Sequence, residues 1–355
     1  MADPKVNTAV LNLQAGERVE VCSESEILST LDALGRLDAL PFMPEMLQYC
    51  GKQFTVQSRA DKTCDTINNS GSRRMWNTVH LAELRCDGSG HDGCQARCLL
   101  FWKEAWLKRV GKPNKLRQAF SMILGMNGNT KVRPSIANAS ITRDMLVQAT
   151  RVWKEGSSSG EKLYSCQATE MLKASVPLSW WRPGQYVRDV CSGNVSPWYV
   201  MRTMMFRAFA KSLTFGAANA QISIYNGVQR ILGGRPYPFR TGRLNKTPSE
   251  KLNLQAGELV QVKSHEEILE TLDERSRNRG LYFDVEMTTA CGGQHRVIQR
   301  VERIINDRTG KLIQLPGGCI MLEGVVCRAL YSDRRIACPR RIYSFWREVW
   351  LRRVD

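Results

Sequence analysis

Four side chains that commonly bind transition metals lie within 13 residues, in the order Cys86, His91, Cys94 and Cys98. Asp, Gly and Ser residues stand among them and allow the chain to wrap around an ion. Thiolates and an imidazole at such short spacings are typical ligands of tetrahedral zinc. An iron–sulfur cluster also takes cysteine ligands, but the mixed His/Cys set and the absence of a ferredoxin-like cysteine run favour zinc. We therefore predict a zinc site, with iron or an iron–sulfur cluster as the weaker alternative.

The segment that carries this loop belongs to a repeated module. LNLQAGERVEVCSESEILSTLD at 11–32 returns as LNLQAGELVQVKSHEEILETLD at 252–273, with 16 of 22 positions identical. The closing FWKEAWLKRV at 101–110 also returns, as FWREVWLRRV at 345–354. Two copies of one module therefore flank a different middle segment. We predict three domains: residues 1–110, a middle domain at 111–250, and residues 251–355.

The second copy keeps only part of the cysteine pattern. Three cysteine positions recur in both copies, pairing Cys50 with Cys291, Cys86 with Cys327 and Cys94 with Cys338. His91 and Cys98 have no counterparts. In one interpretation the first copy binds metal in its local loop and the second has lost the site. In the other, each copy gathers three cysteines from distant segments, completed by His91 or Cys98 in the first copy and by His295 in the second. We favour the local loop for the first copy.

The module itself is predicted to be mainly β. GERVEV and GELVQV alternate polar and apolar residues, as half-buried strands do. Ser23 and Ser264 each begin a short helix, with a glutamate three residues later that completes a capping box. Asn306–Gly310 is predicted to be a hairpin loop, and the repeated tryptophans are expected to pack in the core. We expect an α+β protein in which two small SH3-like β-barrel modules flank a basic helical domain.

Apolar spacing near 3.6 residues predicts helices in the middle segment, at 142–155, 160–175 and 196–213. The SSSG run at 157–160 is expected to break them.

Most of the positive charge lies in this same segment. The chain has a formal net charge of +17, and residues 111–250 carry 20 basic against 6 acidic side chains. Such an excess favours an anionic partner. Within 196–213, aromatic and basic residues alternate, and the candidates for polyanion binding are Trp198, Tyr199, Arg202, Arg207 and Lys211. Three interpretations remain open: a core helix whose cations reach solvent, a phosphate-binding helix, and a helix on an anionic membrane surface.

The LNLQAGE opening, the CDGSGHDGCQARC loop and the FWKEAWL ending resemble a repeated cysteine-bearing small β module of uncharacterised bacterial proteins. The resemblance covers both copies and not the middle segment. It implies a bacterial source and carries no activity.

No signal peptide and no apolar stretch long enough to span a membrane is expected, so the cysteines are interpreted as residing in a reducing cytoplasm. No P-loop, GxGxxG, HExxH or nucleophile-elbow motif is present, and no reaction can be assigned. The sequence favours a cytoplasmic zinc-binding protein whose basic helical body binds a polyanion, most simply nucleic acid. The alternatives are a metal-dependent enzyme with a cysteine-ligated metal and a membrane-peripheral scaffold.

Overall fold

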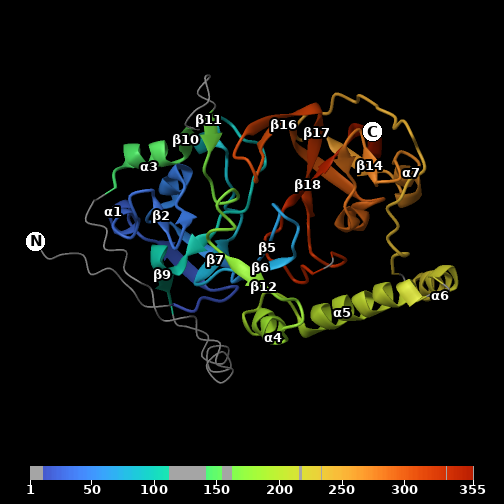
Figure 1. The fold of residues 1–355 in the computed structure, drawn as a ribbon, viewed down its shortest axis with the longest axis horizontal. Coiled ribbons are helices and arrows are strands. Elements are labelled where there is room, and N and C mark those ends of the chain that lie inside the picture. The colour runs from blue at the N-terminus through green and yellow to red at the C-terminus, as the bar shows by residue number, and fades with distance from the viewer. Residues whose placement is uncertain are drawn as a thin grey trace, which may run out of the picture. The chain divides into compact units, whose positions relative to one another are not determined.

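A computed structural model describes residues 11–111, 141–153, 162–215, 218–232, 234–332 and 334–354 (Figure 1). The fold is a mixture of helices and antiparallel sheets. The chain divides into two compact units, neither of which is one continuous segment. Unit 1 comprises Met1–Ser196, Arg303–Gln314 and Ala337–Ile342, and unit 2 comprises Pro197–Glu302, Leu315–Ile336 and Tyr343–Asp355. The sequence prediction, by contrast, used three contiguous domains.

Unit 1 is built on a five-stranded antiparallel sheet with the order β8-β7-β4-β1-β9. Its strands are β1 (Arg18–Val21), β4 (Gln53–Arg59), β7 (Thr78–Leu81), β8 (Trp102–Lys103) and β9 (Leu107–Val110). Val19 lies opposite Phe54 on one side and Arg109 on the other. Val19 and Val21 point into the core, as the alternating GERVEV pattern predicts.

Shorter helices and strands surround this sheet, and the first of the helices begins with the predicted capping box. They are α1 (Glu24–Leu28), β2 (Arg36–Leu37), β3 (Leu40–Pro41), the 3-10 helices η1 (Pro44–Tyr49), η2 (Ser89–His91) and η3 (Glu104–Trp106), β5 (Lys62–Cys64), β6 (Ser72–Arg74), α3 (Arg143–Ala149), β10 (Arg151–Trp153), β11 (Lys162–Tyr164), β12 (Val176–Leu178) and α4 (Gly184–Cys191). The capping box of Ser23 and Glu26 is confirmed at the start of α1.

Two of the predicted middle helices differ from the structure. The helix expected at 142–155 ends at Ala149, and residues 151–153 form β10. The helix expected at 160–175 is absent among the described residues, where β11 pairs with β10 and is followed by turns. Tyr164 N donates to Gly310 O (2.8 Å), so a contact from far along the chain overrides the local helical pattern. The SSSG run lies outside the described residues.

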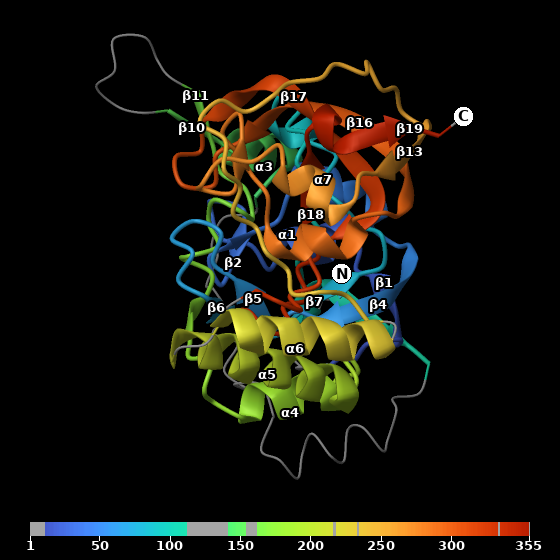
Figure 2. The same cartoon turned by 90° about the vertical axis from the view of Figure 1, so that its right-hand side faces the viewer.

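Unit 2 is built on a second five-stranded antiparallel sheet, with the order β18-β17-β16-β13-β19 (Figure 2). Its strands are β13 (Leu259–Val262), β16 (Gln294–Ile305), β17 (Leu312–Val326), β18 (Tyr343–Trp346) and β19 (Leu351–Arg353). The remaining elements are α5 (Pro197–Ser212), η4 (Leu213–Phe215), α6 (Ala218–Ile231), α7 (His265–Leu269), β14 (Arg277–Asn278), β15 (Leu281–Tyr282), η5 (Val285–Ala290) and η6 (Glu348–Trp350). In the described part of the chain, no strand pairing joins the edges of either sheet into a closed barrel.

The tryptophans of the repeated closing segments fill the cores, as predicted. Trp102 and Trp106 are fully buried in unit 1, where Phe42 packs edge-to-face against both, with ring centroids 6.2 and 5.1 Å away. Trp346 and Trp350 are fully buried in unit 2.

The β16–β17 hairpin contributes to unit 1 as well as to unit 2. Its tip closes with a bond from Asn306 N to Lys311 O (2.8 Å), which confirms the predicted hairpin loop. The tip belongs to unit 1, where Arg303 O accepts from Gln95 N (3.0 Å). Unit 1 is therefore completed by residues that lie beyond position 302 of the chain.

Candidate metal centre

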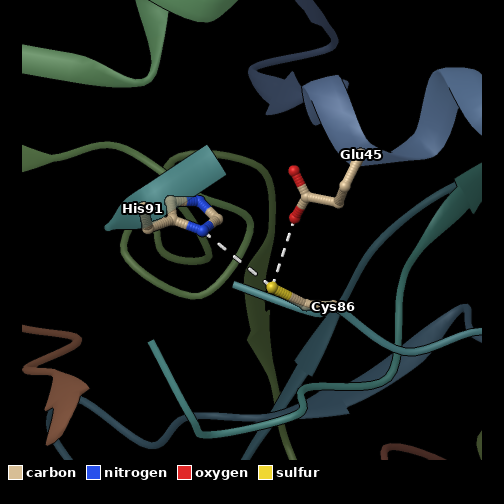
Figure 3. A group of neighbouring side chains, drawn as sticks. All are labelled: Glu45, Cys86 and His91. Atoms are coloured by element: carbon tan, nitrogen blue, oxygen red, sulfur yellow. Dashed lines mark hydrogen bonds between the residues drawn. The ribbon is translucent and has the colours of Figure 1, made fainter. Parts of the chain in front are cut away.

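Three side chains of unit 1 with metal-binding donors converge on one point (Figure 3). They are Glu45 from η1, Cys86 from the segment after β7, and His91 at the end of η2. One donor atom from each lies within 4.8 Å of the others. Cys86 Sγ donates to Glu45 Oε1 over 3.2 Å and lies 3.9 Å from His91 Nδ1.

The loop that carries Cys86 and His91 is shaped by its glycines. Gly88 adopts φ +81°, and a Cβ at this position would lie 2.1 Å from Cys94 O. Gly90 is less constrained, because a Cβ there would approach only the end of the Glu45 side chain, 2.8 Å from Oε2. Asp87 accepts from Ser89 N (2.9 Å) and holds the first turn of the loop. The Gly-rich sequence therefore brings His91 back over Cys86 and leaves room for the Glu45 carboxylate.

The group is buried and contains polar atoms without a protein partner. His91 is 1% exposed and Glu45 is 6% exposed. His91 Nε2 and Glu45 Oε2 are both buried without a hydrogen-bond partner. Unpartnered buried polar atoms are uncommon in folded proteins, and an ion is one of their ordinary explanations.

Burial controls the protonation of all three groups when no cation is bound. It lowers the pKa of His91 to about 4 and raises the pKa of Glu45. The pKa of Cys86 lies well above its ordinary value, first because of burial and then because of the nearby Glu45 charge. A bound cation would reverse this preference for Glu45 and Cys86, since a metal ligand must be deprotonated, whereas burial already keeps His91 in the neutral form that binds a metal.

The structure brings together two of the four residues of the predicted loop site and adds one from elsewhere. Cys94 Sγ accepts from Ile305 N (3.4 Å), and its side chain packs with Tyr164 and Ile305. Cys98 is partly buried, and burial of its sulfur raises the pKa of the thiol to about 12. Neither sulfur joins the group of Glu45, Cys86 and His91.

Sequence reasoning missed Glu45 because 41 residues separate it from Cys86. The signal that marks it is its place in the repeat, where Glu286 is its counterpart. The two carboxylates have different surroundings. Glu286 accepts backbone N–H groups from Leu330 (3.0 Å), Tyr331 (2.6 Å) and Ser332 (2.8 Å). Glu45 instead faces the Cys86 thiol and the His91 imidazole. The carboxylate of the second copy is therefore occupied by backbone N–H groups, whereas the equivalent carboxylate of the first copy points at side chains.

The residues predicted for a second or distributed site form no three-donor group among the described residues. Cys50 packs against the core of unit 1 and Cys291 against the core of unit 2. His295 Nδ1 lies 3.1 Å from Glu323 O. Cys327 belongs to unit 2 and Cys338 to unit 1. No three-donor group includes any of these five residues in the ranges that the structure describes.

The candidate polyanion-binding residues lie on α5, which is confirmed as a helix. Trp198 is 63% exposed, Arg202 and Lys211 are exposed, and Arg207 is partly buried. The Tyr199 hydroxyl donates a hydrogen bond to Arg328 O, another residue of unit 2. On another side of the helix, Phe209 stacks on Tyr225 of α6 with ring centroids 4.8 Å apart. Phe209 thus packs against α6 within unit 2, while Arg202, Lys211 and Trp198 are exposed and Arg207 is partly buried.

Comparison with known proteins adds no relative. No protein-family model matches the chain, and neither a curated protein nor a solved structure is significantly similar to it. In the part of the chain that the structure describes, no cysteine is joined in a disulfide. Among the described residues, no helix combines the length and apolar composition that crossing a bilayer requires.

Proposed function

We propose that this protein binds one zinc ion through Glu45, Cys86 and His91, and that the ion stabilises the fold of unit 1. The observation that carries the proposal is the convergence of the three donors within 4.8 Å, with buried atoms of His91 and Glu45 left unpartnered. Nitrogen, sulfur and carboxylate oxygen are all ordinary zinc ligands. An iron–sulfur cluster is disfavoured because only one of the three donors is a thiol.

The burial of this site favours a structural role over a catalytic one, with a fourth ligand to complete the three that the protein supplies. A catalytic zinc keeps an exchangeable position that substrate can reach, whereas His91 is 1% exposed. The donors also come from segments far apart in sequence, Glu45 and the 86–91 loop. An ion that joins them restrains the long intervening chain, so metal binding adds to the stability of the fold.

The test is metal analysis of anaerobically purified full-length protein by mass spectrometry. We expect one zinc per chain in the parent, and loss of zinc in Glu45→Gln, Cys86→Ser and His91→Ala. Cys191→Ser is the matched control, because it removes a partly buried thiol that lies outside the group. Retained zinc in Glu45→Gln together with its loss in Cys94→Ser and Cys98→Ser would replace this site by the local four-residue loop.

We further propose that the two sheets are copies of one SH3-like module. Their strands follow corresponding orders, and each copy has a capping box, at Ser23 and at Ser264. Equivalent tryptophan indoles also donate to equivalent threonines: Trp106 to Thr30 (3.0 Å) and Trp350 to Thr271 (2.8 Å).

We also propose that α5 and the chain around it bind a polyanion, most simply nucleic acid in the cytoplasm. Between Asp189 and Glu250 the sequence has eight basic residues and no acidic one. Exposed Arg202 and Lys211 can contact phosphates, and exposed Trp198 can stack on a base.

Titration with short single- and double-stranded oligonucleotides at two salt concentrations tests the proposal. We expect Arg202→Gln and Lys211→Gln to weaken binding across sequences and to flatten its salt dependence. Lys108→Gln, which removes an exposed cation from β9, is the control. Undetectable binding by the parent protein at low salt would remove this function.

A further inference from the structure

A cavity of about 140 Å³ in unit 1 has a strongly basic lining that the metal centre and α5 leave unused. Five basic side chains line it, from β4 to α4: Arg59, Lys62, Arg74, Arg182 and Arg188. Only two acidic residues, Asp61 and Asp189, share the lining.

Two of the five cations neutralise those carboxylates. Arg59 Nε pairs with Asp61 Oδ2 over 2.6 Å, and Lys62 forms a short contact with Asp189. Arg59 also pairs with Glu104, through Nη1 and Oε1 at 2.8 Å. These pairs hold β4 and β5 to their neighbours and account for the negative charge at the cavity.

The other three guanidinium groups have no such neutralisation. Arg188 Nη1 approaches Asp61 Oδ2 only to 4.0 Å, and that carboxylate already pairs with Arg59. Arg74 Nε and Arg188 Nε are buried without a hydrogen-bond partner, as is Arg59 Nη2. Arg182 is exposed beside them.

Crowding of these cations is visible in their electrostatics. Burial lowers the pKa of Arg74, and the neighbouring charge of Arg188 lowers it further. A buried charge without a counter-charge is costly. A bound anion would neutralise the excess positive charge of the lining and would relieve the repulsion.

We propose that this cavity binds a phosphate monoester. Guanidinium groups recognise phosphate by paired, charge-assisted hydrogen bonds, and several of them converge here. Gly184 and Gln185, in the first turn of α4, also line the cavity, and the start of a helix favours an anion. At the roughly 30 Å³ that a water takes up in the liquid, the volume corresponds to about five waters. It therefore admits a phosphorylated small molecule or the terminal phosphate of a strand, and excludes a duplex.

Calorimetric titration of the full-length protein with inorganic phosphate and with glycerol phosphate, at constant ionic strength, tests this site. We expect saturable binding of one ligand per chain. Arg188→Gln and Arg74→Gln should each weaken it at least about tenfold, the loss of one charge-assisted hydrogen bond. Arg182→Gln serves as a second, exposed variant if either of these fails to fold.

Arg18→Gln is the matched control, because Arg18 is exposed on β1 and its removal changes the net charge equally. Equal weakening by Arg18→Gln, or an unchanged affinity in Arg188→Gln, would overturn the proposal, as would no saturable binding by the parent. A pair of oligonucleotides with 5′-phosphate and 5′-hydroxyl ends separates the two sources. Preference for the phosphorylated strand over glycerol phosphate assigns a strand end, and the reverse order assigns a small molecule; either order supports the site.

Discussion

Acidification should destabilise the protein through His80, a buried residue of β7. Its Nδ1 lies 2.9 Å from Leu100 O, and its Nε2 is buried without a partner. Burial lowers the pKa of His80 to about 3, and the nearby cations Arg340, Arg85 and Arg341 also lower it. The unfolded chain, with an ordinary pKa near 6.5, therefore binds this proton first as the pH falls.

The sign and size of the effect follow from these two values. Above pH 6.5 His80 is neutral in both the folded and the unfolded chain, so it does not reduce the free energy of unfolding. As the pH falls from 6.5 toward 3, the unfolded chain binds the proton and the free energy of unfolding decreases. At about 1.36 kcal/mol per pH unit, the loss at pH 4.5 is about 3 kcal/mol.

Urea unfolding at pH 8 and pH 4.5, followed by tryptophan fluorescence, measures this loss. His80→Gln removes the titrating group, so the difference between the two pH values should shrink by about 3 kcal/mol in the variant. The imidazole resonances of the four histidines provide a direct check, because that of His80 should remain neutral down to pH 5. Titration of His80 near pH 6.5, or the same pH dependence in parent and variant, would refute the reasoning.

Three further changes should have measurable effects. Trp106→Ala empties a fully buried core site and should lower the free energy of unfolding by about 3–5 kcal/mol in urea titration. Lys62→Met leaves Asp189 buried and unpaired, so it should cost about 3–5 kcal/mol, whereas adding Asp189→Leu should restore most of the loss; no recovery in the double variant would contradict the pairing. Glu286→Gln weakens the acceptor for three backbone amides and should increase hydrogen exchange at Leu330, Tyr331 and Ser332, with unchanged exchange counting against that role.

Local patterns in the sequence predicted the local structure well. The capping boxes at Ser23 and Ser264, the Asn306–Gly310 turn and helix α5 each depend on residues within one or a few turns of chain. Burial of the repeated tryptophans was also predicted, because such large apolar side chains dominate small cores. The helix predicted at 160–175 was wrong because the backbone N–H of Tyr164 donates to Gly310 O. Residue 310 lies too far along the chain for the local sequence around 160–175 to indicate this partner.

The same distinction applies to the candidate metal centre. Cys86 and His91 come together because Gly88 and its neighbours close a short loop, and spacing reveals such a loop. Glu45 reaches the group because η1 packs beside the loop, and the spacing of residues along the sequence does not reveal how η1 packs. Cys94 matches a zinc-binding spacing equally well, yet its sulfur accepts from Ile305, a residue of the second copy.

The segmented make-up of unit 1 has a consequence for how the protein is made. During synthesis, residues 1–196 emerge first, but Gln95, Cys94 and Tyr164 find their partners only when residues 303–310 follow. The nascent first unit therefore waits, incomplete, through the synthesis of more than one hundred further residues. A fragment ending at Ser196 would lack those partners, and a chaperone would be of most use in this interval.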